Sequence, residues 1–290
     1  MKRAILCVYY VPDDMEWMLS LHLKQIRKHS PSGTYKIYAA IIKCSSSVNQ
    51  ILHASPDIKV CEVEAENSHP SKQHSMALTQ LMDRAFRDGC EVAFTLDVDS
   101  FPIRDDWMTS METKAAERQG VCAVHRKENG DSFLPHPCGA AILSTFVDKY
   151  PFEFYPEGIE DKAKHFLSKY NQRPDSGIGL AYVLWENEHS WSEILRSNHV
   201  DLHYMIAGIY GDLIFHLGAG SRRPIFFQEM RCNRIIHLIA PLKGKPLLWR
   251  FHSLIERCVE EYLVRRNRKI VKSVMRKLTN NADAFIESIR

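Results

Sequence analysis

Residues 91–99 of the chain read EVAFTLDVD, a strand-like segment followed directly by two carboxylates. The segment 91–96 has the composition of a strand buried on both faces of a sheet, and Asp97 and Asp99 come next. Two carboxylates beside a buried strand are costly to place without a counter-charge. A divalent cation supplies one, and oxygen ligands suit Mg²⁺ or Mn²⁺. The alternative interpretation is a solvated turn in which Asp99 caps the segment that follows.

Similar apolar runs occur earlier in the chain, with helix-like segments between them. The patterns predict strands over 4–11, 35–42 and 58–63, and helices over 13–30 and 71–87. This alternation predicts an α/β fold with a mostly parallel sheet and flanking helices. Ligands bind beyond the carboxyl ends of parallel strands, so we expect Asp13, Asp97 and Asp99 at one binding edge.

The pattern is looser after Asp99. It predicts a helix over 107–118, a strand over 120–125 and a helix over 177–185. The aromatic-rich stretch 144–175 shows no clear period, and we expect it to be largely irregular.

Composition and charge exclude several classes of protein. The chain has 290 residues, 45% apolar and 25% charged, which is ordinary for a soluble globular protein. It has no run of 18 apolar residues, and its short N-terminal apolar stretch reads as a first strand rather than a signal peptide. The eight cysteines lie at least sixteen positions apart, which favours free thiols in a reducing cytosol. A net charge of +3 is too small to demand a nucleic-acid partner.

The last forty residues differ from the rest in charge. We expect a catalytic domain over 1–250 and a basic, amphipathic helical tail over 251–290. Within the tail, 262–278 contains seven Lys and Arg residues and no acid, with its apolar positions on one helical face. This helix lies on an anionic membrane with its apolar face down, or it packs on the catalytic domain or on a second subunit.

A second motif, IFHLGAGSRR, occupies 214–223. Its glycines and serine allow backbone N–H groups to approach an anion, and Arg222 and Arg223 offer bidentate phosphate contacts. His216 is a candidate metal ligand beside them. The alternative is a core histidine followed by a surface turn.

A third motif, RPDSG, occupies 173–177 and places Asp175 at a corner that opens a predicted helix. A carboxylate there projects into a cleft, where it serves as general base for an attacking hydroxyl. The alternative is a helix N-cap, which aspartate forms well. Glu186 and Glu188 are rival bases nearby.

A fourth motif, HPCGAA, occupies 136–141. Small residues after a loop permit close approach of the backbone to a ligand. A tightly packed core strand is the plain alternative.

Together these motifs resemble the GT-A glycosyltransferases, in particular bacterial family-2-like enzymes. The resemblance covers about residues 3–225, and the motifs occur in that family's order. It implies a GT-A, Rossmann-like fold and assigns roles to matching positions. These are donor binding by Tyr10, Val11, Asp13, Asp97, Arg222 and Arg223; metal ligation by Asp97, Asp99 and His216; acceptor-side contacts by Gly139 and Ala140; and catalysis by Asp175.

The resemblance implies transfer of a hexosyl or N-acetylhexosaminyl group from a nucleotide-diphosphate donor to a hydroxyl acceptor. The acceptor is a glycan or a lipid-linked saccharide, the ion is Mn²⁺ or Mg²⁺, and Asp175 deprotonates the acceptor if the enzyme inverts the anomeric centre. The implied setting is polysaccharide biosynthesis in the cytoplasm or at the inner face of the membrane, with peripheral contact through 262–278.

Two other functions use the same residues. A haloacid-dehalogenase-like phosphatase also carries D-x-D after a strand, with Asp97 as nucleophile, but that family expects Thr or Val where Phe101 stands. A non-catalytic nucleotide-sugar-binding protein would keep the fold without turnover.

Overall fold

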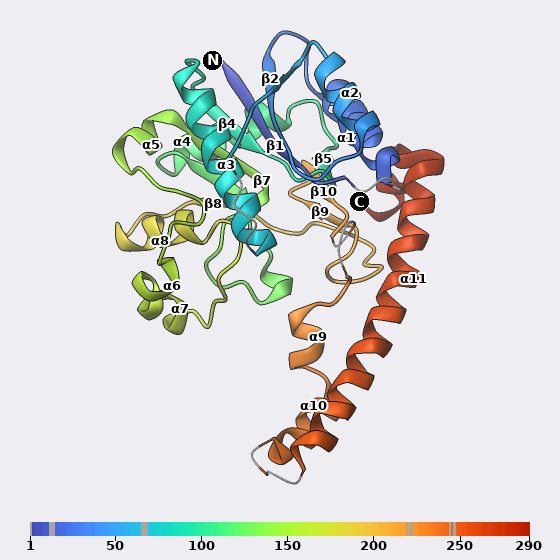
Figure 1. Ribbon diagram of the computed structural model, residues 1–290. Coiled ribbons are helices and arrows are strands. Elements are labelled where there is room, and N and C mark those ends of the chain that lie inside the picture. Colours follow the sequence, from blue (N-terminus) through green and yellow to red (C-terminus); the bar gives the residue numbers. More distant parts are fainter. Residues whose placement is uncertain are drawn as a thin grey trace.

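The apolar runs of the first half form the centre of a seven-stranded sheet in a computed structural model that describes residues 2–11, 15–64, 69–218, 220, 223–243, 245 and 248–290. The strand order is β3-β2-β1-β4-β7-β6-β8, and a second sheet has the order β5-β10-β9 (Figure 1). The strands are β1 (Arg3–Tyr9), β2 (Tyr35–Ile41), β3 (Ile58–Val60), β4 (Val92–Thr95), β5 (Ser100–Pro102), β6 (Val121–Val124), β7 (His136–Leu143), β8 (Ser192–Ile194), β9 (Gly208–Tyr210) and β10 (Ile214–His216).

Helices flank the large sheet, as the α/β prediction requires. The α-helices are α1 (Glu16–His29), α2 (Ser46–Ala54), α3 (Pro70–Arg87), α4 (Trp107–Glu117), α5 (Ser144–Lys149), α6 (Ile159–Lys162), α7 (Lys164–Lys169), α8 (Ile178–Glu186), α9 (Phe227–Arg231), α10 (Arg234–Ile239) and α11 (Trp249–Ile289). The 3₁₀ helices are η2 (Lys127–Asn129) and η3 (Ala240–Leu242). Within the described residues, no helix is both long and apolar enough to span a membrane.

The strand directions determine which chain segments meet at one edge of the sheet. Neighbours β3, β2, β1 and β4 are parallel, whereas β7 runs antiparallel to both β4 and β6. The mostly parallel sheet is therefore confirmed, with β7 as the reversed strand. As a result the carboxyl ends of β1, β4 and β6 lie at the same edge as the beginning of β7.

The sheet is buried on both faces because successive side chains of a strand point in opposite directions. In β1, Ile5 and Cys7 face the layer that contains α1 and α4, while Leu6 and Val8 face α3. The prediction for 71–87 is confirmed by α3, which buries Leu78, Leu81 and other apolar residues at helical spacing. Each such leucine contributes about 1.5–3 kcal/mol when fully buried.

The expectation that 144–175 is irregular is wrong. This stretch contains α5, α6 and α7, and Phe166 is buried in an aromatic cluster with Phe133 and Tyr170. Each of these helices has only four to six residues. Such short helices span less than two turns, so no apolar period is visible in the sequence. All eight cysteines carry free thiols.

The C-terminal residues form one 41-residue helix, α11, which is kinked at Asn281. Val271, Val274 and Leu278 are buried in the same core cluster as β1 and α1. Asp283 adds an ion pair with Lys28 at 2.8 Å. The alternative in which 262–278 packs on the catalytic domain therefore holds for Val271, Val274 and Leu278, whose side chains contact the core.

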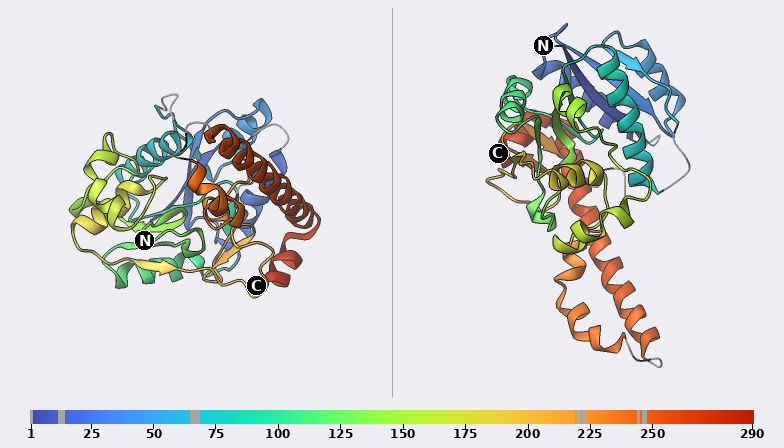
Figure 2. Two further views of the ribbon diagram at one scale, coloured as in Figure 1. Left: turned by 90° about the horizontal axis from the view of Figure 1, so that it is seen from below. Right: turned by 90° about the vertical axis from the view of Figure 1, so that its left-hand side faces the viewer.

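The preceding elements project away from the body of the molecule. The described residues of 227–262, comprising α9, α10, η3 and the first part of α11, form a helical arm, which we refer to as the arm (Figures 1 and 2). The right-hand view of Figure 2 shows α11 running from the core out to the end of the arm.

We expect Leu278→Ala to lower the free energy of unfolding by about 2–5 kcal/mol, because it leaves a cavity between α11 and the core. Chemical denaturation of the full chain measures this. Leu254→Ala is the matched control, since Leu254 lies on the same helix but is 56% exposed, and it should change stability by less than about 0.5 kcal/mol. Equal stability of the two variants would contradict the burial of the C-terminal part of α11.

Candidate functional site

Side chains from four strand ends meet in one cavity. Tyr10 follows β1, Asp97 follows β4, Arg126 follows β6 and His136 begins β7. These residues line a cavity of about 210 Å³ at the edge where the strand directions bring them together. The predicted binding edge is thus where the structure places Asp97 and Asp99, while Asp13 lies outside the described residues.

Asp97, Asp99 and His216 form a cluster whose ligand atoms all lie within 4.8 Å of one another. The cluster depends on the antiparallel pairing of β5 with β10, which places His216 directly opposite Ser100. His216 Nε2 is 3.5 Å from Asp99 Oδ1. Burial opposes a charged His216 imidazole, but the neighbouring Cys138 and Asp99 outweigh it and hold the pKa of His216 above its usual value.

The cluster fits a divalent cation. Asp97 Oδ1 is buried and accepts no hydrogen bond from the described residues, and its neighbour His74 Nε2 lies at 3.3 Å. A buried carboxylate oxygen in this state is costly unless a cation or proton compensates it. Two carboxylates and an imidazole form a donor set that suits Mn²⁺ or Mg²⁺.

The loop after β10 closes over Asp99. Leu217 N donates to the Asp99 carbonyl at 2.8 Å, and Gly220 N donates to Asp99 Oδ2 at 3.2 Å. A Cβ on Gly220 would itself lie 3.2 Å from that carboxylate oxygen, so glycine allows this close approach. The predicted anion contact of Arg222 falls outside the described residues.

A buried histidine of α1, His22, contacts the backbone of the segment that carries Asp97 and Asp99. His22 Nδ1 lies 2.7 Å from the Ser100 carbonyl, which can only accept, so the ring donates. Burial lowers the pKa of His22 to about 4, against smaller opposing effects from Ser100 and Asp99. His22 is therefore a neutral donor that holds the backbone next to Asp99.

Asp175 is held by groups from three parts of the chain. Ser71 Oγ donates to Oδ1 at 3.1 Å, Ser176 N donates to Oδ1 at 2.8 Å, and Arg126 Nη2 donates to Oδ2 at 3.3 Å. The helix α8 begins at Ile178, and its N-cap residue is Gly177, so no side chain caps it. Asp175 is therefore not the N-cap that the alternative interpretation required.

Gly177 allows the Asp175 corner to approach the start of β7. Its φ is +91°, a backbone conformation that favours glycine. A Cβ at this position would lie 2.6 Å from the Pro135 carbonyl oxygen. Any other residue at this position would force this corner or the Pro135 backbone to shift.

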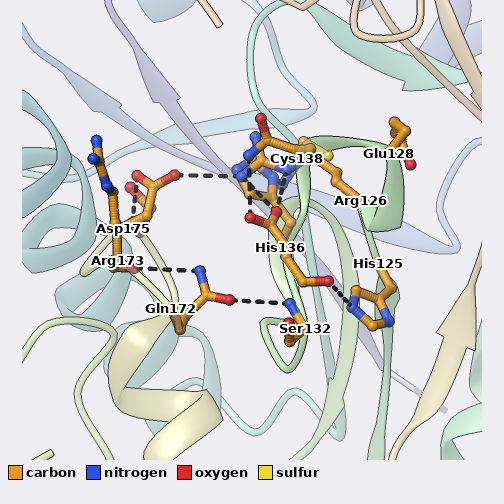
Figure 3. A network of polar contacts seen from close by, with 12 residues as sticks. His125, Arg126, Glu128, Ser132, His136, Cys138, Gln172, Arg173 and Asp175 are labelled. Carbon is orange, nitrogen blue, oxygen red and sulfur yellow. Dashed lines mark hydrogen bonds and ion pairs between the residues drawn. The ribbon is translucent and has the colours of Figure 1, made fainter. Parts of the chain in front are cut away.

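The buried guanidinium of Arg126 joins Asp175 to a second carboxylate. Its Nε donates to Asp131 at 3.1 Å, and Arg126 and Asp131 have side chains only 4% and 6% exposed. Burial works against the charge on Arg126, but Asp131 and Asp175 outweigh it and hold the pKa of Arg126 above its usual value. Figure 3 shows this network, in which Gln172 also bridges Ser132 and the Arg173 carbonyl.

The first turns of α3 contact both acidic centres. Ser71 binds Asp175, and His74, three residues later on the same side of the helix, lies beside Asp97. The helix therefore contacts both Asp175 and the cluster of Asp97, Asp99 and His216.

A larger cavity of about 640 Å³ adjoins the first. Ser71, Arg126 and Asp175 line both cavities, so Asp175 stands on a shared wall. The far side of the larger cavity is formed by residues of the arm and the segment leading into it, including Phe226, Arg231 and Glu256.

Several predicted site residues lie elsewhere. Gly139 and Ala140 are core residues of β7 and line neither cavity; a Cβ at Gly139 would lie 3.0 Å from Val124 Cγ2. Gly139 and Ala140 are therefore packed as the core-strand alternative expects, and an acceptor-side role for them stays a prediction. Val11 is likewise buried in the core. Arg223 pairs with Glu260 and Glu261 on α11, at 2.6 Å each.

The rival bases are also placed away from the cluster. Tyr182 donates to Glu186 at 2.8 Å, and Glu186 and Glu188 line a separate cavity beside α7 and α8. This leaves Asp175 as the carboxylate at the shared wall.

The sequence analysis missed Ser71, Arg126, His136 and His22. Arg126 carried a signal, because it follows an apolar run at 121–124 just as Asp97 follows 92–95. Ser71 and His22 carried no such signal, since serine and histidine are common in helices that contribute nothing to a functional site.

No family model matches the chain. No curated protein matches it either. Solved structures that resemble it include TarS from S. aureus, with a TM-score of 0.38 and 14% identity over 55% of this chain and 51% of that chain. The mannosyltransferase PcManGT from Pyrobaculum calidifontis, in complex with GDP-Man and Mn²⁺, has a TM-score of 0.38 and 13% identity over 60% and 55%.

The galactosyltransferase LgtC, in complex with donor and acceptor sugar analogs, has a TM-score of 0.41 and 10% identity over 67% of this chain and 73% of that chain. The chain spans about half the length of the TarS and PcManGT structures.

We expect Asp99→Asn to weaken Mn²⁺ binding by about tenfold or more, because it removes one of two carboxylate charges from the cluster. Isothermal titration calorimetry with MnCl₂ measures this. Asp105→Asn is the control, since Asp105 is exposed and lies outside the cavity. Identical Mn²⁺ affinities of the two variants would show that the cluster is not a metal site.

Proposed function

We propose that this protein is a metal-dependent glycosyltransferase that moves a sugar from a nucleotide-diphosphate donor to a hydroxyl acceptor. One observation carries the proposal: Asp175 lies on the wall shared by two cavities, and one of these contains the Asp97, Asp99 and His216 cluster. A transferase needs a donor site and an acceptor site that meet at a single reacting centre. This arrangement supplies both.

The smaller cavity is the donor site in this proposal. Asp97, Asp99 and His216 would hold Mn²⁺ or Mg²⁺, which when bound neutralises the charge that develops on the departing diphosphate. Tyr10 is 44% exposed at the cavity, where its ring offers a surface on which a nucleobase stacks. Arg222 remains a sequence-based candidate for the diphosphate.

Asp175 is the proposed general base for the acceptor hydroxyl. Ser71, Ser176 and Arg126 orient its carboxylate, and its side chain remains 38% exposed at the shared wall. It would accept the hydroxyl proton as the acceptor oxygen bonds to the anomeric carbon and the bond from that carbon to the diphosphate breaks. Attack from the face opposite the leaving group inverts the anomeric centre.

The larger cavity is the proposed acceptor site. Asn129, Gln172 and Arg173 line it with groups that donate to and accept from sugar hydroxyls. The arm closes its far side, so an extended saccharide would lie between the body and the arm. The resemblance of the motifs supports a hexosyl or N-acetylhexosaminyl donor and an acceptor used in polysaccharide biosynthesis in the cytoplasm.

We expect Asp175→Asn to lower kcat for sugar transfer by about 10²–10⁴-fold while leaving donor binding intact, because it removes the base but not the metal cluster. A panel of UDP-, GDP-, CDP- and dTDP-sugars with Mn²⁺ first identifies the donor by thermal shift. The same shift should persist in Asp175→Asn and disappear in Asp99→Asn. Glu186→Gln is the control and should retain full activity.

The outcomes separate the alternatives. If Asp175→Asn transfers sugar at the normal rate, Asp175 is not the base, and analysis of the product anomer by NMR would show whether configuration is retained. If no nucleotide sugar shifts the melting temperature, the donor assignment fails. Release of phosphate from phosphorylated compounds, lost in Asp97→Asn, would favour the phosphatase instead.

A further inference from the structure

The end of the arm exposes large apolar side chains. The exposed fractions are 81% for Leu238, 51% for Ile235, 51% for Trp249, 56% for Phe251, 56% for Leu254 and 39% for Leu248. They come from α10 and the beginning of α11, at the end of the arm farthest from the sheet (Figure 1). Apolar surface gathered in one place on an otherwise polar protein marks a contact with a partner or a membrane.

The exposed apolar residues are additional to those that hold the arm together. Ile239 of α10 and Val259 of α11 are buried, so the helices already have apolar contacts within the molecule. Leu248, Phe251 and Tyr262 continue along α11 at helical spacing on its exposed side. Core formation therefore does not account for them.

The end of the arm is positively charged. Residues 230–255, which we call the tip, contain five Lys and Arg residues and no Asp or Glu. All five are exposed, and they are Arg231, Arg234, Lys243, Lys245 and Arg250. Basic side chains around exposed Trp, Phe and Leu match an anionic bilayer, whose headgroups attract the cations while the apolar side chains enter the interface. Trp249 is of the type enriched at that interface.

The same charge argues against a second copy of the chain as the occupant. A symmetric dimer through the tip would place two such basic surfaces against each other, because a twofold contact uses the same patch on both subunits. Like charges in contact are unfavourable, whereas an anionic lipid surface is complementary.

The arm is anchored so that the tip has a fixed direction. The side chain of Glu229 at its base is 6% exposed, Asn267 Nδ2 donates to it at 2.5 Å, and Arg266 also pairs with it. His203 Nδ1 accepts from Met205 N, which leaves Nε2–H to donate to Glu229 at 3.1 Å. Burial and the neighbouring Arg266 lower the pKa of His203 to about 4, in keeping with this neutral form. Beyond this anchor α11 continues into the core.

We propose that the tip docks on an anionic lipid bilayer, with Trp249, Phe251 and Leu238 in the interface and the basic residues against the headgroups. This surface differs from the helix face of 262–278 that carries Val271, Val274 and Leu278, whose side chains are buried in the body. Docking would set the larger cavity, walled partly by Arg231 and Ile236, near the membrane surface. The binding step itself is independent of the proposed transferase activity.

The test is flotation of the full chain with vesicles of phosphatidylcholine containing 30% phosphatidylglycerol, without donor or metal. We expect binding to these vesicles at 0.1 M NaCl and at least tenfold weaker binding to pure phosphatidylcholine. The double variant W249S and F251S, and separately the double variant K243E and R250E, should each weaken binding at least tenfold. Unchanged melting temperatures would show that these variants remain folded.

The matched control is the double variant R268E and K272E, which makes the same charge change on exposed residues of α11 outside the tip. It should bind within about twofold of the wild type. Equal losses in the control and tip variants would overturn the assignment to the tip, as would equal binding to charged and neutral vesicles. A third outcome would identify a second copy as the occupant instead. In that case the wild type would not bind vesicles, light scattering would show a dimer, and the tip variants would be monomers.

Discussion

The antiparallel pairing of β5 with β10 is the contact on which the candidate site depends. It joins residues more than a hundred positions apart and places His216 opposite Ser100, next to Asp99. Hydrogen bonds from Leu217 and Gly220 to Asp99 continue the same contact beyond the strands. Without this pairing, two aspartates would stand at a sheet edge with no third ligand. His22 strengthens the arrangement by fixing the Ser100 carbonyl from the core side.

A charged side chain is buried near this contact, although desolvation makes its burial unfavourable. Arg126 is nearly inaccessible to water, yet it carries the charge that joins Asp131 and Asp175. Such a buried pair is weak evidence for stability, because desolvation opposes the attraction between its members. Its value here is positional: a guanidinium has a rigid fork of donors, so it holds both carboxylates in defined places. The Asp175 carboxylate is thereby held on the cavity that the cluster of Asp97, Asp99 and His216 also lines.

The helix α11 serves two parts of the molecule at once. Its C-terminal part, with Val274 and Leu278, completes the core on the face that also contains α1. Its N-terminal part carries the exposed Trp249 and Phe251 outward in the arm. Because one continuous helix connects the two, the direction of the arm follows from the fold of the domain. Glu256 of the same helix lines the larger cavity, which lies between body and arm.

Local patterns in the sequence were sufficient for the parallel strands at the centre of the sheet and for two of the three residues of the cluster. Apolar runs predicted β1, β2 and β4, helical spacing predicted α3, and the position of Asp97 and Asp99 after a buried run predicted the acidic edge. These features are readable because the period of side-chain burial is a local property of strands and helices. His216 was a candidate from its own motif, but its place beside Asp99 was known only through the order of motifs in a resembling family.

The tertiary structure alone decided which distant residues share a surface. Arg126 and His136 reach the cavity because β7 is reversed relative to β4 and β6, and strand direction is set by long-range pairing that no local pattern encodes. The same holds for Gly139 and Ala140, which small size made candidates for a ligand contact and strand packing placed in the core. The same is true of α11, because its amphipathic basic sequence was compatible both with binding to a membrane and with packing on the domain. The sequence by itself determined which residues are apolar and which are charged. Only the fold determined which residues each of them contacts, because contacts between distant residues depend on the path of the whole chain.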